Sequence, residues 1–199
     1  MRAYVVFCHP RRQSFTGAAL DRVLAGLAAG GHEVRVTDLY AEAFVPELDA
    51  AALAAHHVDH RGHPERRPGI ELYVEHLAWC DALVLVHPTW WSAQPAMLKG
   101  FFDRVLVKGV AYDLPEGADR IRPRLRHIRR LVVVTSHGSP KYVNAVQGES
   151  GKRIVGRTLR GLCSWRCRTR WIALYNIDRA GDAKRTAFLD RVERRLQRL

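Results

Sequence analysis

Two adjacent tryptophans follow directly after an apolar run in the segment HPTWWSAQP, residues 87–95. Large aromatic side chains are costly to expose unless they face a ligand or a partner. A flat ring such as a flavin would stack on Trp90 and Trp91. The alternative is that both indoles pack in the core, but a position just after a strand disfavours it. We therefore expect a ligand site at residues 87–95.

A second candidate segment, HPRRQSFT at residues 9–16, leads from an apolar run into an expected helix. Backbone N–H groups at such a helix start, with the hydroxyls of Ser14 and Thr16, can hold a phosphate or pyrophosphate. Equally, either hydroxyl can simply cap the helix. The pattern G-x-G-x-x-G is absent from the chain, which excludes the usual dinucleotide-binding fingerprint.

The third candidate segment is residues 136–151, where Gly138 would let a ligand approach the backbone closely. The stretch from Gly148 to Lys152 departs from a phosphate-binding P-loop, because valine stands where the first glycine belongs and arginine follows the lysine. Ser136 and His137 are neighbours, and no G-x-S-x-G motif is present, so a serine hydrolase triad is not expected.

A histidine cluster and a pair of cysteines could carry chemistry, but we expect neither to do so. His56, His57, His60 and His63, with Glu65, could bind a transition metal, but the glycine and proline among them favour a solvated loop, so no metal site is expected. Cys163 and Cys167 are interpreted as buried or surface thiols in preference to a redox pair. The four cysteines lack paired C-x-x-C spacing, and no secretion signal is recognised, so we expect reduced thiols and a cytoplasmic protein.

The elements that must position these segments alternate along the chain. Strands are predicted at residues 3–8, 33–37, 82–86, 131–135 and 170–175, and the alternation in 33–37 indicates a sheet edge. Helices are predicted at 16–29, where Gly30 and Gly31 end the helix, and at 69–79, 95–106, 151–163 and from 182 onward. This order predicts a single α/β domain over residues 1–199, a doubly wound, five-stranded parallel sheet in three layers, α/β/α. The three candidate segments then share the carboxyl edge of the sheet, where ligands bind in such folds.

Composition excludes other classes. The chain has 199 residues, 47% of them hydrophobic, and no apolar run long enough to span a membrane, so membrane insertion is not expected. The net charge of +12 is uneven, with 21 Lys and Arg against 5 Asp and Glu after residue 119. A basic half attracts nucleic acid, anionic lipid or phosphorylated small molecules. Few aromatics stand among these arginines, chiefly Trp165 and Trp171, so we expect no nucleic-acid partner.

The three segments together resemble the flavodoxin-like NAD(P)H:quinone oxidoreductases, and also the ancillary flavoproteins of glutathione-gated potassium efflux systems. The resemblance covers residues 1 to about 151, and its most specific part is PTWWS followed by PAMLKGFFDRV, residues 88–92 and 95–105. GVAY at 109–112 and TSHG at 135–138 complete it. The third segment departs from the family, which has Thr-Thr-Gly-Gly at that place.

The resemblance implies which residues would form the site. The phosphate end of a flavin would be held by His9, Gln13, Ser14, Phe15 and Thr16. The ring would be lined by Pro88, Thr89, Trp90, Trp91, Thr135, Ser136, His137 and Gly138. Tyr142 matches a tyrosine that the family places over the flavin, but Ser150 stands where quinone reductases have a histidine. The catalytic role would therefore fall to Tyr142 or His137.

The resemblance also implies an activity: hydride transfer from NADPH or NADH through the flavin to a quinone or similar acceptor, by an enzyme that is a homodimer. The alternative function is that of a regulatory flavoprotein bound to a membrane potassium-efflux transporter. FMN is favoured over FAD because no segment for an adenine is obvious. NADPH is favoured over NADH because basic residues such as Lys141, Lys152 and Arg153 follow the third segment.

Overall fold

The protein is built on a five-stranded parallel sheet. The structure, a computed structural model, describes residues 1–56, 58 and 69–199. The strand order is β2-β1-β3-β6-β7, with strands at β1 (Arg2–Phe7), β2 (Glu33–Asp38), β3 (Ala82–Pro88), β6 (Arg130–His137) and β7 (Arg168–Tyr175). The doubly wound parallel sheet, its five strands and the edge position of β2 are therefore confirmed.

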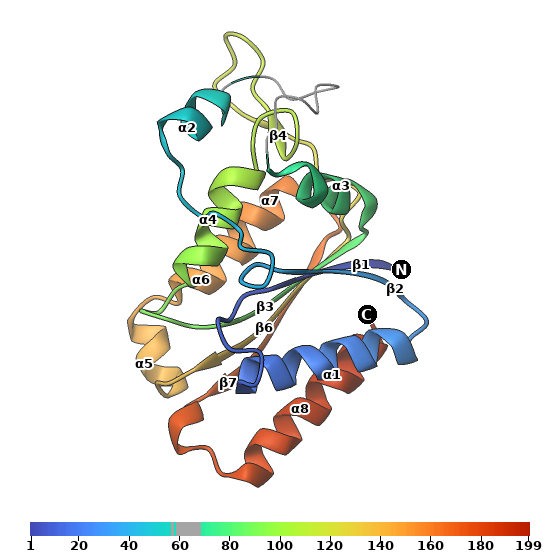
Figure 1. Cartoon of the computed structure of the whole chain (residues 1–199), viewed down its shortest axis with the longest axis vertical. Coiled ribbons are helices and arrows are strands. Elements are labelled where there is room, and N and C mark those ends of the chain that lie inside the picture. Colours follow the sequence, from blue (N-terminus) through green and yellow to red (C-terminus); the bar gives the residue numbers. More distant parts are fainter. Residues whose placement is uncertain (57, 59–68) are drawn as a thin grey trace.

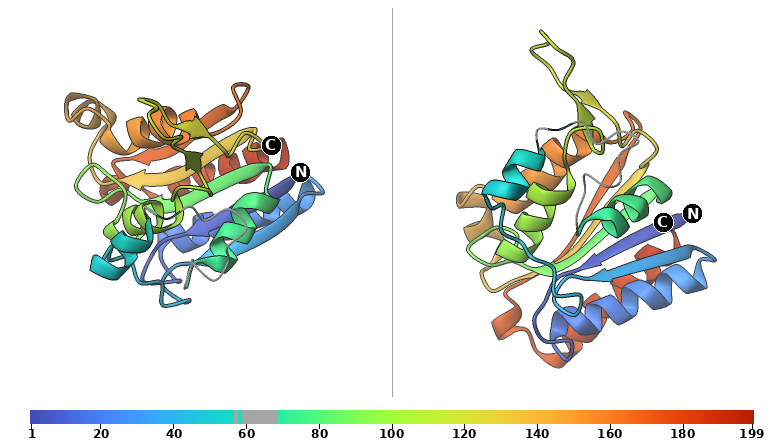
Figure 2. Two further views of the ribbon diagram at one scale, coloured as in Figure 1. Left: turned by 90° about the horizontal axis from the view of Figure 1, so that it is seen from above. Right: turned by 45° about the horizontal axis from the view of Figure 1, so that its top comes forward.

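Helices cover both faces of this sheet, as Figure 1 and the two views of Figure 2 show. One face carries α1 (Phe15–Ala29) and α8 (Asp182–Gln197). The other carries α3 (Glu71–Trp79), α4 (Ala96–Val105) and a continuous helical stretch made of α6 (Ser150–Arg153), η2 (Ile154–Leu159) and α7 (Arg160–Leu162). The expected helix over 151–163 therefore exists, but its middle turn, η2, is a wider π-helix.

Alternation along the central strands builds one core on each side of the sheet. In β1, Tyr4 and Val6 pack among the residues under α3 and α4, while Val5 and Phe7 pack under α1 and α8. Successive side chains of a strand point to opposite faces, so a strand covered on both faces must be apolar throughout. This is why the central strands of the sheet read as continuous apolar runs.

Helix α1 begins and ends where its sequence signals predict. The Ser14 side chain caps it by accepting a hydrogen bond from the backbone N–H of Gly17 at 3.1 Å. Gly31 follows the end of the helix with φ +66°, a left-handed conformation that favours glycine. A Cβ at Gly26 would lie 2.4 Å from the carbonyl oxygen of Glu193, so this glycine lets α1 and α8 approach closely.

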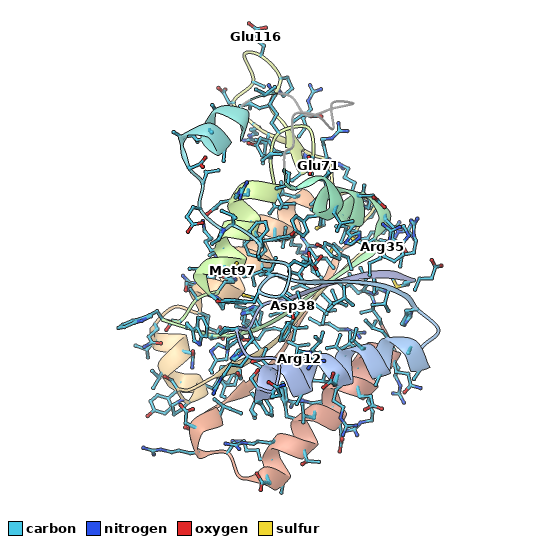
Figure 3. All side chains as sticks on the ribbon, viewed as in Figure 1. Arg12, Arg35, Asp38, Glu71, Met97 and Glu116 are labelled. Carbon is cyan, nitrogen blue, oxygen red and sulfur yellow. The ribbon has the colours of Figure 1, made fainter. Side chains whose placement is uncertain are left out.

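Several short elements lie outside the predicted pattern. They are α2 (Ala50–His56), α5 (Lys141–Val146) and the paired strands β4 (Tyr112–Asp113) and β5 (Arg122–Pro123). The loop between β4 and β5 extends from the body of the protein, and Figure 3 shows Glu116 at its tip. The side chains of the histidine cluster at 56–63, and Glu65, lie outside the described residues.

All four cysteines are free and buried, which confirms the buried-thiol alternative for Cys163 and Cys167. Burial raises the pKa of Cys8 and of Cys80 to about 12. Over residues 1–56, 58 and 69–199, no helix is long and apolar enough to cross a membrane. The same residues hold no group of three or more His, Cys, Asp or Glu side chains placed to bind a metal ion.

Candidate active site

The three candidate segments meet at the carboxyl edge of the sheet. The backbone N–H of Thr89 donates to the carbonyl oxygen of Ser136 at 2.8 Å, and the rings of His9 and Trp90 lie 6.2 Å apart. A cavity of about 570 Å³ opens there, lined by Thr89, Trp90, Trp91, Ser92, His137, Gly138, Ser139, Asn144 and Gln147. Its volume falls in the range of small-molecule sites.

A tight turn holds the two tryptophans at the mouth of this cavity. Trp90 and Ala93 exchange two backbone hydrogen bonds, of 3.2 and 3.0 Å. Between them, Trp91 and Ser92 have φ angles of +49° and +60°. Both lie in the left-handed region, which costs a residue with a side chain about 1–2 kcal/mol. The backbone is therefore strained at this position, as it commonly is at functional sites.

The turn is fixed from outside by its neighbours on the third segment. The Ser92 hydroxyl donates to Gln147 Oε1 at 2.5 Å. The Ser150 hydroxyl donates to the carbonyl oxygen of Ser92 at 2.7 Å. Trp90 is 42% exposed and Trp91 is fully exposed, so the alternative that both indoles fill the core is wrong.

His137 lies beneath the turn with a defined proton position. Its Nδ1 lies 2.8 Å from Asn144 Oδ1, and the Asn144 amide nitrogen donates to the carbonyl oxygens of Ser139 and Pro140. Because those donations fix the amide orientation, Oδ1 is the acceptor and Nδ1 carries the proton. Burial is the main cause that lowers the pKa of His137, which keeps the ring neutral at pH 7. Nε2 is then an acceptor, 3.5 Å from Thr89 Oγ1.

A stacked tyrosine supports this imidazole from behind. The rings of His137 and Tyr175 lie 4.6 Å apart at an angle of 18°. The Tyr175 hydroxyl donates to Glu149 Oε1 at 3.3 Å, and Glu149 pairs with Lys152 at 2.8 Å. The hydrogen bond from Lys152 is the main cause that lowers the pKa of Glu149. His137 is thus held by a packed and hydrogen-bonded surround.

The first segment supplies two free backbone donors. Within the described chain, the N–H groups of Phe15 and Thr16 at the start of α1 have no acceptor. A helix start with unpaired N–H groups is suited to an anion. The Phe15 ring, in contrast, packs 5.8 Å from that of Phe188 and belongs to the core.

A buried histidine lies just behind this helix start. His87 is fully buried and its Nδ1 donates to the carbonyl oxygen of Pro88 at 2.9 Å. Its Nε2 has no hydrogen-bond partner among the described residues, and it lines a small hollow with Thr16, Thr135 and Ser136. Burial lowers the pKa of His87 to about 4, so the ring is neutral.

The remaining predicted residues take several positions. Gln13 is exposed, Pro88 ends β3 in the core, and Thr135 Oγ1 lies 3.1 Å from Thr89 Oγ1. Tyr142 is 72% exposed on α5 and does not line the cavity.

Sequence reasoning had assigned no role to four polar residues that line the cavity, Ser92, Ser139, Asn144 and Gln147. For Asn144, a faint signal exists, because a polar residue four positions after Pro140 can bond back to that carbonyl oxygen.

Comparison with known proteins finds relatives in fungi and mammals. A ribosyldihydronicotinamide dehydrogenase-like protein of Penicillium crustosum is 30% identical over 169 residues, covering 76% of this chain and 62% of that protein. NAD(P)H dehydrogenase [quinone] 1 of Rattus norvegicus is 30% identical over 162 residues, covering 75% and 58%. This chain therefore spans less than two thirds of the length of these relatives.

Solved structures are similar over nearly the whole chain. A protein of Streptococcus mutans UA159 superposes with a TM-score of 0.84 at 27% identity, covering 100% of both chains. The NAD(P)H:quinone oxidoreductase from Methanothermobacter marburgensis gives 0.79 at 28% identity, covering 99% of this chain and 96% of that one. The family described as having a flavodoxin-like fold matches residues 1–199. With its sheet order and its three loops at one edge, this protein belongs to that flavodoxin-like family.

Proposed function

We propose that this protein is a flavin-dependent NAD(P)H oxidoreductase that reduces a quinone or a similar acceptor. The observation that carries the proposal is the strained tryptophan turn over a 570 Å³ cavity with a neutral histidine on its wall. The names of relatives support it, since that of Rattus norvegicus is named an NAD(P)H dehydrogenase [quinone] and that of Methanothermobacter marburgensis an NAD(P)H:quinone oxidoreductase.

The residues present fit a flavin at both of its ends. The free N–H groups of Phe15 and Thr16 at the start of α1 would hold its phosphate. The ring would lie against Trp91 and Thr89 on one loop and against His137 on the other, all of which line the cavity. We propose FMN before FAD, and either NADPH or NADH as the electron donor.

When bound, a flavin accepts two electrons as hydride and passes them on to an acceptor. The chain contributes positioning and proton control. The tryptophan turn holds Trp90 and Trp91 at the mouth of the cavity, where a flat ring would lie against them. His137 Nε2, with its lone pair toward Thr89, would accept a hydrogen bond from a hydroxyl or ring N–H in the cavity. Ser150 braces the turn by donating to the Ser92 carbonyl oxygen. We therefore assign the catalytic role to His137 before Tyr142, because His137 lines the cavity and Tyr142 does not.

We further propose that two copies pair over this site. Trp91 is exposed at the mouth of the cavity, and α5, whose Asn144 lines the cavity, exposes Tyr142 and Val146, of which Val146 is 88% exposed. Apolar side chains gathered beside a cavity are typical of an interface. Light scattering of the purified protein should give twice the 22.6 kDa mass of the chain, and a monomer at micromolar concentration would contradict the pairing.

The function is tested in two steps. Purified protein titrated with FMN and then with FAD should develop the absorbance of a bound flavin, and failure with both would overturn the proposal. The flavin-loaded protein should then oxidise NADPH or NADH in the presence of 1,4-benzoquinone. His137→Leu should lower that turnover about 100-fold or more while flavin still binds, because acid–base groups typically contribute ~10²–10⁴-fold. Unchanged turnover in this variant would remove His137 from the mechanism.

A further inference from the structure

A second cavity lies at the opposite edge of the sheet, where the strands begin. Its volume is about 600 Å³, and it is lined by Arg126, Arg129, Arg130, Ser164, Trp165, Arg166 and Arg168, the arginine cleft. Arg130 opens β6, Arg168 opens β7, and the two are register partners in adjacent parallel strands. In Figure 1 this edge is the one near the N-terminus, and α5 marks the far edge with the candidate active site.

The positive charge of the cleft is not neutralised within the described chain. None of its five arginines forms an ion pair with a residue that the structure describes. Arg130 Nε is buried without a hydrogen-bond partner there, although Nη1 donates to the carbonyl oxygen of Arg129 at 3.1 Å. The pKa of the next arginine on β7, Arg170, is lowered by burial first and then by Arg130, Arg195 and Arg168. Such mutual repulsion is relieved by an anion.

An exposed indole stands beside these guanidinium groups on a braced loop. Trp165 is 73% exposed, and the Arg166 guanidinium lies 4.5 Å from its ring centroid. Arg160 fixes the loop from inside, with Nε donating to the carbonyl oxygen of Cys167 at 3.1 Å and Nη2 to that of Trp165 at 3.3 Å. The Cys167 N–H donates to the Ser164 carbonyl oxygen at 2.8 Å. The ring is therefore presented to solvent by a preformed loop.

We propose that the arginine cleft binds a free nucleotide, with its phosphate groups on the guanidinium forks and its base on the open face of Trp165. Guanidinium forks bind phosphate oxygens in pairs, and five of them match a chain of several phosphates. Indole rings stack on flat bases. The cleft has the volume of a small-molecule site.

The surroundings argue against larger anions. A bilayer surface is bound by several apolar side chains that enter the interface together, whereas the arginine cleft offers one, Trp165. Duplex DNA is read by a helix or a two-stranded ribbon that enters a groove, and the cleft is instead a hollow between two strand ends and a loop.

Isothermal titration of the full chain with ATP, in buffer without divalent cations, tests the proposal. The cleft variants are the double substitution Arg166→Gln with Arg168→Gln, and Trp165→Ala. The matched charge control is Arg157→Gln with Arg194→Gln, which removes two exposed arginines, on η2 and α8, outside the cleft. Trp91→Ala reports on binding at the other edge. Inorganic tripolyphosphate replaces ATP in a parallel series, and a 20-nucleotide thymidine strand in a third.

We expect ATP binding to weaken about tenfold or more in the double variant and severalfold in Trp165→Ala, with both controls unchanged. Tripolyphosphate should lose affinity in the double variant only, because it has no base. Circular dichroism should show all variants folded. Unchanged ATP binding in the double variant, or its loss in Trp91→Ala, would overturn the cleft as the site. No effect of Trp165→Ala on ATP would overturn the base platform, and tighter binding of the thymidine strand than of ATP would overturn a free nucleotide.

Discussion

Replacing Trp91 by alanine should weaken flavin binding without weakening the fold. The Trp91 side chain is fully exposed, so its ring buries no surface against the rest of the described chain. Its φ of +49° is imposed by the turn and not by packing of the indole. Removing the ring therefore costs the free protein almost nothing. If the ring stacks on a flavin, the loss is that of one aromatic stacking face.

The contribution of the Trp91 ring to flavin binding can be separated from the strain of the Trp91 backbone by comparing two substitutions. One stacking face is worth about 1–3 kcal/mol, by analogy with bases on aromatic side chains, which raises the flavin Kd roughly 5- to 150-fold. Trp91→Gly should lose the same stacking but relieve the left-handed backbone. That relief is about 1–2 kcal/mol, reduced by the greater freedom of glycine in the unfolded chain, ~0.4–1 kcal/mol. The net gain of about 1 kcal/mol corresponds to a Tm roughly 2–4 °C above that of Trp91→Ala.

Two measurements on each variant decide the matter. Quenching of flavin fluorescence gives the Kd, and thermal unfolding without flavin gives the Tm. Trp165→Ala is the matched control, because it removes an exposed indole from the opposite edge of the sheet and should leave the flavin Kd unchanged. Trp90→Ala should weaken flavin binding less than Trp91→Ala. A wild-type Kd in Trp91→Ala, or a Tm for Trp91→Gly below that of Trp91→Ala, would refute the reasoning.

Three further predictions concern protonation, thiols and the electron donor. Because the folded-state pKa of His87 is about 4, below the 6.5 of the unfolded chain, its contribution to stability is complete above pH 6.5 and declines toward pH 4. We expect His87 to lower the free energy of unfolding by about 2 kcal/mol when the pH falls from 7.5 to 5, and denaturant unfolding at both pH values measures this. The fall should be smaller by that amount in His87→Gln. An equal fall in the variant and in the unaltered protein would contradict the assignment. Cys8 and Cys80, buried and with pKa values of about 12, should react with a thiol reagent only after unfolding, and rapid labelling of the native protein would show otherwise. NADPH should reduce the bound flavin faster than NADH in stopped-flow traces. The double variant Lys141→Gln with Arg153→Gln should bring the two reduction rates closer together. Equal rates with the two coenzymes in the unaltered protein would contradict the expected preference for NADPH.

Much of the fold was predictable because its signals are local. A strand covered on both faces must be apolar at every position, and this is what marks residues 3–8 and 131–135. Ser14 and the Gly30-Gly31 pair define the ends of α1 by cap chemistry that short-range sequence carries. The short helix α5 escaped prediction because its six residues show too little periodicity.

The candidate site was only partly predictable. The segments could be placed at one sheet edge, but the turn at Trp91 and Ser92 carries no glycine or asparagine, the usual signals of a left-handed turn. The proton position on His137 depends on the Asn144 amide, whose orientation is set by two carbonyl oxygens of the folded loop. The arginine cleft depends on strand register, since Arg130 and Arg168 are 38 positions apart in sequence and adjacent only in the sheet.

The arginine cleft and the tryptophan turn lie at opposite edges of the sheet, so the salt concentration decides whether the charges of the cleft act at the tryptophan turn. A strand of eight residues such as β6 is about 26 Å long at ~3.3 Å per residue. At physiological ionic strength the Debye length is about 8 Å, so the charges of one edge are hidden from the other. At 0.01 M salt it is about 30 Å, and the whole sheet then lies within one electrostatic field. In dilute buffer, the rate at which an anionic coenzyme reaches the candidate active site would therefore depend on the arginine cleft as well. At physiological ionic strength, the two edges are electrostatically independent of each other.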